Sequence, residues 1–257
     1  MSRIHLFEFE DQQWLPEFIR NYITDFLQFL SNNTPMYKGI VPIIEKGLKE
    51  SQTNQIIDLA SGGGGGLIWL DTELRKTNPD LKILLTDYFP NIPAFEHTQK
   101  HADNFDFVKT PVDARYVPEN LKGLRTQFLS FHHFKPKDAQ QILQNAIDTN
   151  SSIAIFEGQE RSFQSIMAMI FSPITVLITT PFIRPFHIGR IIFTYLIPIV
   201  PILILWDGVV SSLRTYSVEE MNALVSNLKN KENFNWEIKK VKSGPTKILY
   251  LLGTKKN

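Results

Sequence analysis

Cysteine is absent from the 257-residue sequence, which excludes disulfide bonds, thiolate nucleophiles and zinc sites with cysteine ligands. The sequence also lacks an excess of either charge, because 27 basic residues face 26 acidic ones. Net charge therefore gives no indication of a nucleic-acid-binding surface, and we expect no nucleic-acid partner. Residues 1–10 are charged and contain no long apolar core, so no secretory signal is apparent. These observations favour a cytoplasmic protein.

The most informative stretch is a run of five glycines at residues 62–66. An apolar segment containing one acid, residues 56–59, precedes the run, and residues 67–70 resume an apolar pattern. This order predicts a buried strand, a tight turn and the start of a helix. Glycine lets the backbone turn sharply and approach a ligand closely, and the N–H groups at a helix start attract a carboxylate or a phosphate. A flexible linker would lack the apolar flanks.

Two kinds of nucleotide cofactor fit such a turn. A dinucleotide fingerprint, G-x-G-x-x-G, would need its third glycine at Leu67 or Ile68, so neither frame is complete. The alternative pattern has an acid, a small residue two places on, and glycines at alternate positions, as in Asp58, Ala60, Gly62 and Gly64. It resembles the first motif of the class I S-adenosylmethionine-dependent methyltransferases, with Ala60 where that family usually has glycine.

Two further acids follow predicted strands. Asp87 follows the second strand and is suited to accept hydrogen bonds from both ribose hydroxyls, with Tyr88 packing on the adenosine. Asp113 and Ala114 follow the third strand. They resemble the family's third cofactor contact, in which the acid binds the adenine amino group and the next backbone N–H meets the ring. The resemblance implies S-adenosylmethionine as the cofactor. The cofactor-binding residues that we predict are Asp58, Ala60, Ser61, Gly62, Gly64, Asp87, Tyr88, Asp113, Ala114 and Phe131.

A pair of histidines, His132 and His133, follows the fourth predicted strand. Ligands of open α/β sheets collect outside the carboxyl ends of the strands. A histidine with a pKa near ~6.5 can take the proton of an attacking hydroxyl. Alternatively, one or both histidines only hydrogen-bond the backbone and pack. Because neighbours at a strand end point in opposite directions, a metal site is disfavoured. Glu157, after the fifth strand, is expected to orient the base or bind an acceptor hydroxyl; a salt bridge to Arg161 is the alternative.

The first fifty residues predict two helices. Aromatic residues recur at near-helical spacing from Trp14 to Phe29, residues 31–35 interrupt the pattern, and residues 40–48 suggest a second helix. Core packing is the simpler interpretation of the aromatic stripe. The other is a lid over the cofactor and the acceptor, from which Tyr22 and Tyr37 reach the ligand.

Charge is absent from residues 163–183 and again from residues 191–206. This region exceeds an ordinary loop and predicts an apolar insertion after the fifth strand. A membrane span needs about 20 apolar residues, but prolines and the short second run disfavour one. One interpretation is a hairpin that enters one leaflet of the membrane, with Arg184 and Arg190 near lipid phosphates and Trp206 at the interface. The other is a soluble cap whose apolar faces cover the cleft and a dimer partner. Either gives the acceptor pocket an apolar wall, which favours a hydrophobic or lipid-like acceptor.

The residues after the insertion complete the predicted site and sheet. Arg214 would suit a carboxylate or polar head of the acceptor, unless it pairs with Asp207. Ser217 begins a helix with a capping box, and two strands follow as a hairpin, which again resembles the family's fold. The catalytic residues that we predict are His132, His133 and Glu157, and the substrate-binding residues are Tyr22, Tyr37, Trp206, Arg214 and Tyr216.

The sequence therefore predicts an α/β fold, a doubly wound, mostly parallel seven-stranded sheet of the Rossmann-like methyltransferase type. Its expected parts are a helical lid (1–50), a cofactor-binding core (51–162), the apolar insertion (163–213) and a C-terminal helix with a strand hairpin (214–257). The expected reaction is methyl transfer from S-adenosylmethionine to an oxygen of a hydrophobic small molecule. The alternatives are a membrane-attached binding module with this fold and an NAD-dependent oxidoreductase. Peripheral contact with the inner face of the membrane and a homodimer are the associations that this organisation allows.

Overall fold

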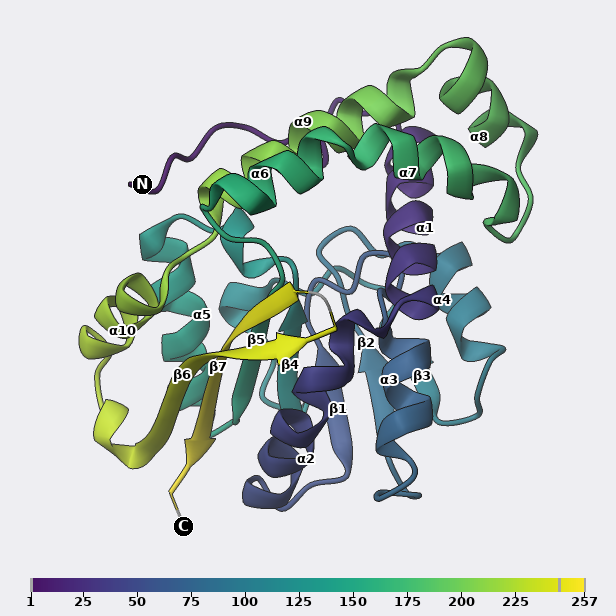
Figure 1. The fold of residues 1–257 in the computed structure, drawn as a ribbon. Helices are drawn as coiled ribbons and strands as arrows, with labels where there is room; N and C mark the ends of the chain where they lie inside the picture. Colours follow the sequence, from purple (N-terminus) through teal and green to yellow (C-terminus); the bar gives the residue numbers. More distant parts are fainter. Residues whose placement is uncertain (1, 245, 257) are drawn as a thin grey trace.

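The computed structural model describes residues 2–244 and 246–256. Its central sheet has seven strands in the order β3-β2-β1-β4-β5-β7-β6 (Figure 1). The strands are β1 (Gln55–Asp58), β2 (Lys82–Leu85), β3 (Phe105–Phe107), β4 (Leu124–Phe128), β5 (Ile153–Glu157), β6 (Phe234–Ser243) and β7 (Thr246–Lys255). Strands β1 to β5 are parallel, whereas β7 runs antiparallel to both β5 and β6. This arrangement confirms the predicted fold class.

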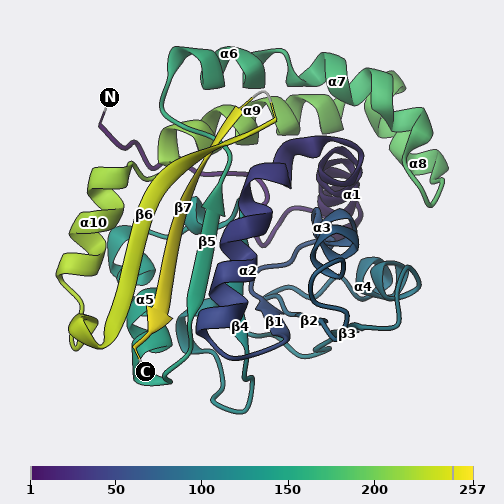
Figure 2. The ribbon, with the colours of Figure 1, turned by 60° about the horizontal axis from the view of Figure 1, so that its bottom comes forward.

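Helices cover both faces of the sheet (Figure 2). On one face lie α2 (Val41–Glu50), α3 (Leu67–Leu74) and α4 (Ile92–Gln99), and on the other α5 (Pro136–Asp148) and α10 (Val218–Ser226). Neighbouring residues of β1 point to opposite faces, so Ile56 packs in the core under α2, α3 and α4, and Ile57 packs in the core under α5 and α10. Because both faces are buried, β5 is an uninterrupted apolar run from Ile153 to Phe156, whereas the central strand β4 carries the buried polar residues Arg125, Thr126 and Gln127.

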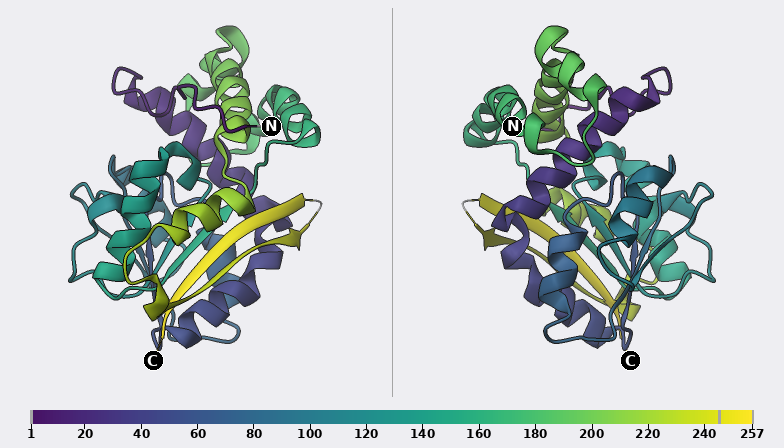
Figure 3. Two further views of the ribbon diagram at one scale, coloured as in Figure 1. Left: turned by 90° about the vertical axis from the view of Figure 1, so that its left-hand side faces the viewer. Right: turned by 90° about the vertical axis from the view of Figure 1, so that its right-hand side faces the viewer.

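A third layer of helices lies above the carboxyl ends of the parallel strands (Figures 1 and 3). It consists of α1 (Glu17–Asn33), α6 (Phe163–Ile170), α7 (Ser172–Thr179), α8 (Ile188–Ile191) and α9 (Ile199–Arg214). Ile19, Ile23 and Phe26 of α1 form a separate core with Val176 of α7 and Leu203 of α9. Short turns of other helix types connect the elements: η1 (Pro35–Ile40), η2 (Ala114–Tyr116), η3 (Phe131–His133), η4 (Thr180–Phe182), the π-helical η5 (Ile192–Leu196) and η6 (Lys231–Asn233).

Helix α4 is an element that the sequence analysis missed. The side chain of Asn91 caps it by accepting a hydrogen bond from the N–H of Ala94, and Pro93 lies in its first turn. Both residues are signals of a helix start. They follow Asp87 so closely that the segment resembled an ordinary loop after a strand.

The insertion is attached to α1 by a buried ion pair. Arg190, which we expected near lipid phosphates, is 2% exposed and pairs with Asp25 of α1. Its guanidinium also donates to the carbonyl of Pro185 at 3.1 Å. The prediction for Arg190 is therefore wrong. The side chain is held inside the layer because Asp25 faces it from α1.

Replacing Arg190 by methionine should destabilise the protein, because Asp25 would remain partly buried without its cation. We expect a loss of about 2–3 kcal/mol in the free energy of unfolding, near the lower limit for a broken buried pair. Urea unfolding followed by circular dichroism measures this loss. The control is Arg184→Met, because Arg184 is exposed and its replacement should change stability by no more than about 0.5 kcal/mol. Equal midpoints for the two variants would contradict the anchoring role.

Candidate active site

The glycine run forms the turn between β1 and α3. Gly64 has φ +90°, and a Cβ there would lie 2.7 Å from the Thr98 hydroxyl oxygen, so the position has no room for a side chain. Ala60 has φ +56°, a conformation that costs an L-residue with a Cβ about 1–2 kcal/mol. The backbone geometry thus explains why glycine is usual at the position of Ala60 in the motif that the sequence resembles.

Three acids surround one cavity of about 580 Å³ next to this turn. Asp58 ends β1 and accepts a hydrogen bond from the Thr126 hydroxyl at 2.7 Å, since Thr126 lies beside it on β4. Asp87 accepts hydrogen bonds from the backbone N–H groups of Gly62, at 2.7 Å, and Phe89, at 2.8 Å. Asp113 pairs with Arg115 at 2.7 Å. The carboxyl ends of neighbouring parallel strands therefore bring all three acids together, as the sequence predicted.

The environments of these acids give them different pKa values. Burial raises the pKa of Asp58 to about 7, although the Thr126 hydroxyl opposes the shift. Burial also raises the pKa of Asp87, and the backbone N–H groups of Phe89 and Gly62 limit the rise. For Asp113, burial favours the neutral acid, but the hydrogen bonds from Arg115 outweigh it and lower the pKa. Asp113 is thus the acid held most firmly in its ionised form.

Most of the predicted cofactor-binding residues line the cavity. These are Asp58, Ala60, Ser61, Gly62, Gly64, Asp87, Tyr88, Asp113 and Ala114. Phe131 is not among the lining residues, because its fully buried ring packs against Tyr216 at 5.5 Å. Its neighbours Leu129 and Ser130 reach the cavity instead.

The two histidines lie in the turn η3 directly after β4. His133 lines the cavity, whereas His132 is buried behind it. The imidazole Nδ1 of His132 is 2.8 Å from a carboxylate oxygen of Glu157, and its backbone N–H donates to the other oxygen. The alternative partner of Glu157, Arg161, pairs with Glu220 instead. Glu157 therefore orients His132, and only His133 can reach a ligand.

The two imidazole rings stack at 4.4 Å with an interplanar angle of 29°. The expectation that they point in opposite directions is wrong, because η3 is a helical turn and not an extended strand. Ligand atoms of Glu8, His132 and His133 lie within 4.8 Å of one another, which a metal ion could use. However, a guanidinium nitrogen of Arg214 lies 2.9 Å from Glu8 and 2.7 Å from Asp11. The carboxylates are thus charge-compensated without an ion.

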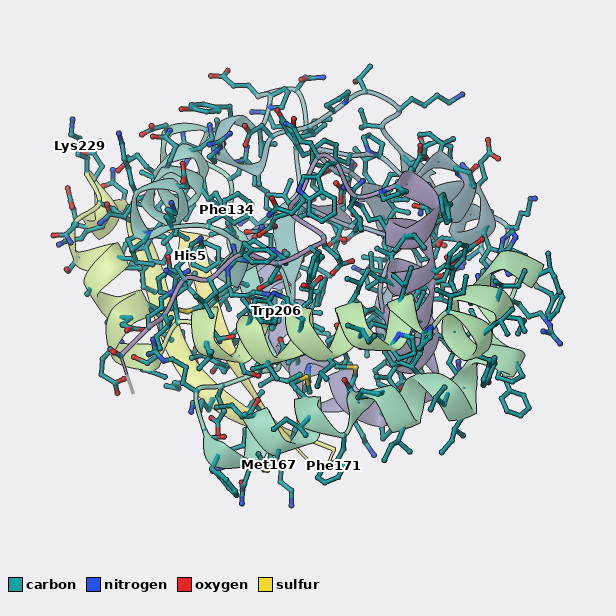
Figure 4. The ribbon with its side chains drawn as sticks, turned by 90° about the horizontal axis from the view of Figure 1, so that it is seen from above. His5, Phe134, Met167, Phe171, Trp206 and Lys229 are labelled. Atoms are coloured by element: carbon teal, nitrogen blue, oxygen red, sulfur yellow. The ribbon has the colours of Figure 1, made fainter. Side chains whose placement is uncertain are left out.

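Residues 3–11, which we call the N-terminal strap, supply acids that the sequence analysis did not consider. The strap runs along α9 (Figure 3), and in Figure 4 its His5 lies close to Phe134. Asp11 accepts from His133 Nδ1 at 2.8 Å, and Glu8 lies 3.2 Å from the same atom. Burial alone would lower the pKa of His133, but the carboxylates of Glu8 and Asp11 raise it to about 9. His133 is therefore an imidazolium at neutral pH in the cofactor-free protein.

No family model and no curated protein matches the sequence. Among solved structures, the chain is similar to PigF with SAH (18% identity, TM-score 0.52, 95% of this chain and 63% of that chain). It is also similar to human N-acetylserotonin methyltransferase in complex with SAM (15% identity, TM-score 0.51, 93% of this chain and 57% of that chain). A third similar structure is a putative Zn-dependent alcohol dehydrogenase from Rhodobacter sphaeroides (13% identity, TM-score 0.53, 93% of this chain and 98% of that chain). The chain spans about three fifths of the length of the first two structures.

The strand order of this chain differs from that of dinucleotide-binding sheets. Dinucleotide-binding sheets have the order 3-2-1-4-5-6, whereas here the antiparallel β7 is inserted between β5 and β6. The chain has the class I methyltransferase fold. At these identities the similarity shows the fold and leaves the activity to the site itself.

In this methyltransferase fold the outer wall of the cavity comes from α1 and the strap. Arg20, Thr24 and Gln28 of α1 line it, while Ile19 and Ile23, on the opposite side of the helix, pack under the insertion. None of residues 163–206, all of which the structure describes, lines the cavity. The expected apolar wall from the insertion is therefore wrong, because α1 stands between the insertion and the cavity.

The structure separates the residues predicted to bind the acceptor. Tyr37 lines the cavity. Tyr22 instead packs against Phe18 and His187, the Trp206 indole donates to the Phe7 carbonyl, and the Tyr216 hydroxyl donates to the Phe134 carbonyl. Arg214 is buried by Glu8 and Asp11, and its alternative partner Asp207 accepts hydrogen bonds from the N–H groups of Phe9 and Glu10. These four residues therefore position the strap and the insertion around the cavity.

Proposed function

We propose that the protein is an S-adenosylmethionine-dependent methyltransferase that acts on an oxygen of a small-molecule acceptor. The convergence of the glycine turn with Asp58, Asp87 and Asp113 on one cavity supports this proposal. The cavity volume of about 580 Å³ lies within the range of roughly 300–1,000 Å³ found for small-molecule sites. The glycine turn and Asp87 would hold the sugar and the amino-acid end of the cofactor, and Asp113 with Ala114 the adenine.

When bound, S-adenosylmethionine supplies an electrophilic methyl group. The chain's own residues would align the acceptor and take its proton. His133 is the candidate base, because it is the histidine that lines the cavity, and Asp11 holds its ring at 2.8 Å. His132 and Glu157 support η3 from behind through two hydrogen bonds. Fixing the acceptor in line can contribute several kcal/mol to the rate enhancement.

The acceptor that we propose is hydrophobic or lipid-like, with one polar group. Tyr88 and Phe89 line the cavity, are about half exposed, and pack edge-to-face at 4.9 Å. Leu27 and Phe134 add apolar surface, while Arg20 offers a cationic contact. An aromatic mouth above a polar floor suits a molecule with an apolar body and a reactive oxygen.

Calorimetric titration with S-adenosylmethionine and with NAD tests the cofactor. We expect heat of binding with S-adenosylmethionine only, and no binding of it at millimolar concentration would refute the proposal. Asp87→Ala should weaken binding about 10- to 100-fold, because an ionised hydrogen-bond acceptor contributes roughly 1.5–3 kcal/mol. The matched control is Asp106→Ala, an exposed acid on β3 that does not line the cavity. Transfer of labelled methyl groups into a lipid extract then separates an enzyme from a binding module.

A further inference from the structure

The outer surface of the insertion is apolar to an unusual degree. Leu196 is 77% exposed, Phe163 72%, Ile188 67% and Phe182 64%, and Ile178 and Phe171 follow closely. Figure 4 shows this surface from above, with α6 and α7 lying beside α9, and Met167 and Phe171 labelled on its outer side. We call the exposed side chains of residues 163–206 the apolar face.

Polar groups are nearly missing from the apolar face. Among its exposed residues, only Gln164, Arg184 and His187 have side chains that are neither apolar nor aromatic. A helix on the surface of a soluble protein normally turns a charged or polar side to water. Here the inner side of the helical layer packs on α1, so the apolar residues on the opposite, outer side have no partner within the described chain. Contiguous apolar patches of this kind mark interaction sites.

The charges of the apolar face favour an anionic surface as the partner. No aspartate or glutamate occurs in residues 162–206, and Arg184 and His187 are exposed within the face. A second copy bound through a two-fold interface would place this face against itself, so its cations would meet no acid. An anionic bilayer supplies the missing negative charge together with an apolar interior. Tyr195, which is exposed on the apolar face, is a residue type that favours the membrane interface.

The packing of the layer favours helices that lie in the plane of the bilayer. By length and composition Phe163–Phe182 could cross a membrane, and the pair Ile188–Leu196 and Ile199–Arg214 is a second candidate that is bent by 75°. However, α6 and α7 pack along α9, whose inner side packs on α1. A spanning orientation would draw α1, with its cavity-lining polar residues, into the hydrocarbon. An interfacial position buries the apolar face and leaves α1 in place.

We propose that the apolar face docks the protein peripherally on anionic lipid bilayers. Docking would bring the cavity, which lies on the other side of α1, close to lipid-like molecules. The docking stands on the apolar face alone and does not depend on the proposed methyl transfer.

Sedimentation of the full chain with vesicles tests the docking. We expect binding to vesicles that contain phosphatidylserine in phosphatidylcholine, and weaker binding to phosphatidylcholine alone. The variant Ile178→Asn/Phe182→Asn/Leu196→Asn should lose more than tenfold in partitioning, because each removed side chain is exposed and would be buried in lipid. Arg184→Gln should lose about fivefold with the anionic vesicles only. The control is Tyr116→Asn, which removes a similarly exposed aromatic outside the apolar face and should bind like the parent.

Two results would overturn the proposal. One is equal binding of the triple variant and the parent. The other is a parent that binds neither kind of vesicle and forms a dimer in solution, together with a triple variant that is monomeric. The partner of the apolar face is then a second copy of the chain. Titration of S-adenosylmethionine on the same samples keeps the two proposals apart. Cofactor binding without vesicle binding rejects the docking alone, and vesicle binding without cofactor binding rejects the methyltransferase alone.

Discussion

His133→Gln is expected to lower the rate of methyl transfer by about 10²–10⁴-fold, the range for removal of a general base. Glutamine can still donate a hydrogen bond to Asp11, so the strap keeps a partner, but its amide cannot accept the acceptor's proton. Cofactor affinity should stay close to that of the parent, because the glycine turn and the three acids are untouched. Transfer of labelled methyl groups into the acceptor measures the rate, and calorimetry measures the affinity.

His101→Gln is the control for this variant, because His101 is an exposed histidine of the α/β domain that does not line the cavity. It should retain the parent's rate. If His133→Gln also retains that rate, His133 is not the base. A loss of cofactor affinity equal to the loss of rate would instead assign His133 to cofactor binding.

The pH dependence provides a second readout of the same residue. Glu8 and Asp11 hold the pKa of His133 at about 9, so only a small fraction is neutral at pH 7. If His133 is the base, kcat/KM rises with pH and levels off above about 9. The positive charge of the bound cofactor disfavours the imidazolium, so the midpoint for kcat should lie lower. Asp11→Asn removes one carboxylate and should lower the kcat/KM midpoint by about one unit or more. A rate that falls above pH 9 would mean that the imidazolium is the active form.

The features that the sequence predicted are those decided by neighbours along the chain. The apolar run before the glycines fixes β1, and the glycines fix the turn, because both depend on local backbone preferences. The convergence of Asp58, Asp87 and Asp113 followed from these strands, since parallel strands end at the same edge of a sheet. The two C-terminal strands predicted as a hairpin are β6 and β7, which pair antiparallel. Local chemistry was therefore sufficient for the sheet and for the floor of the cavity.

The upper part of the site depends on contacts between residues that are distant in sequence. Asp11 and His133 are separated by 122 positions, and nothing in either segment identifies the other as its partner. The insertion shows a related limit. Hydrophobicity located it, but an apolar helix can turn its side chains toward a cavity or away from it. The insertion packs on the side of α1 that carries Ile19 and Ile23, and Arg20 and Thr24 on the other side of the helix line the cavity.

Asp58→Asn is expected to stabilise the cofactor-free protein at alkaline pH. Asp58 is buried, and burial raises its pKa to about 7 from the ordinary 3.8. A carboxyl whose pKa is raised on folding contributes stability below pH 3.8, and that contribution is lost as the pH rises through 7. Above pH 7 the folded protein therefore carries the cost of a buried charge. Asparagine removes this cost and can still accept the hydrogen bond from Thr126, so we expect a gain on the order of 2–4 kcal/mol at pH 8.

The gain should shrink to less than about half at pH 5, because Asp58 of the folded parent is then protonated, and only the cost of taking up that proton on folding remains. Burial also raises the pKa of Asp207 to about 7, so the parent's own stability changes with pH, and the informative quantity is the difference between variant and parent at each pH. Urea unfolding at both pH values gives this difference, with Asp106→Asn as the exposed control. A variant that is less stable than the parent at pH 8 would show that the Asp58 charge is compensated in the folded protein. If the gain is found together with weaker binding of S-adenosylmethionine, Asp58 lowers the stability of the fold but contributes to cofactor binding. Such a trade-off between stability and function is common for functional residues.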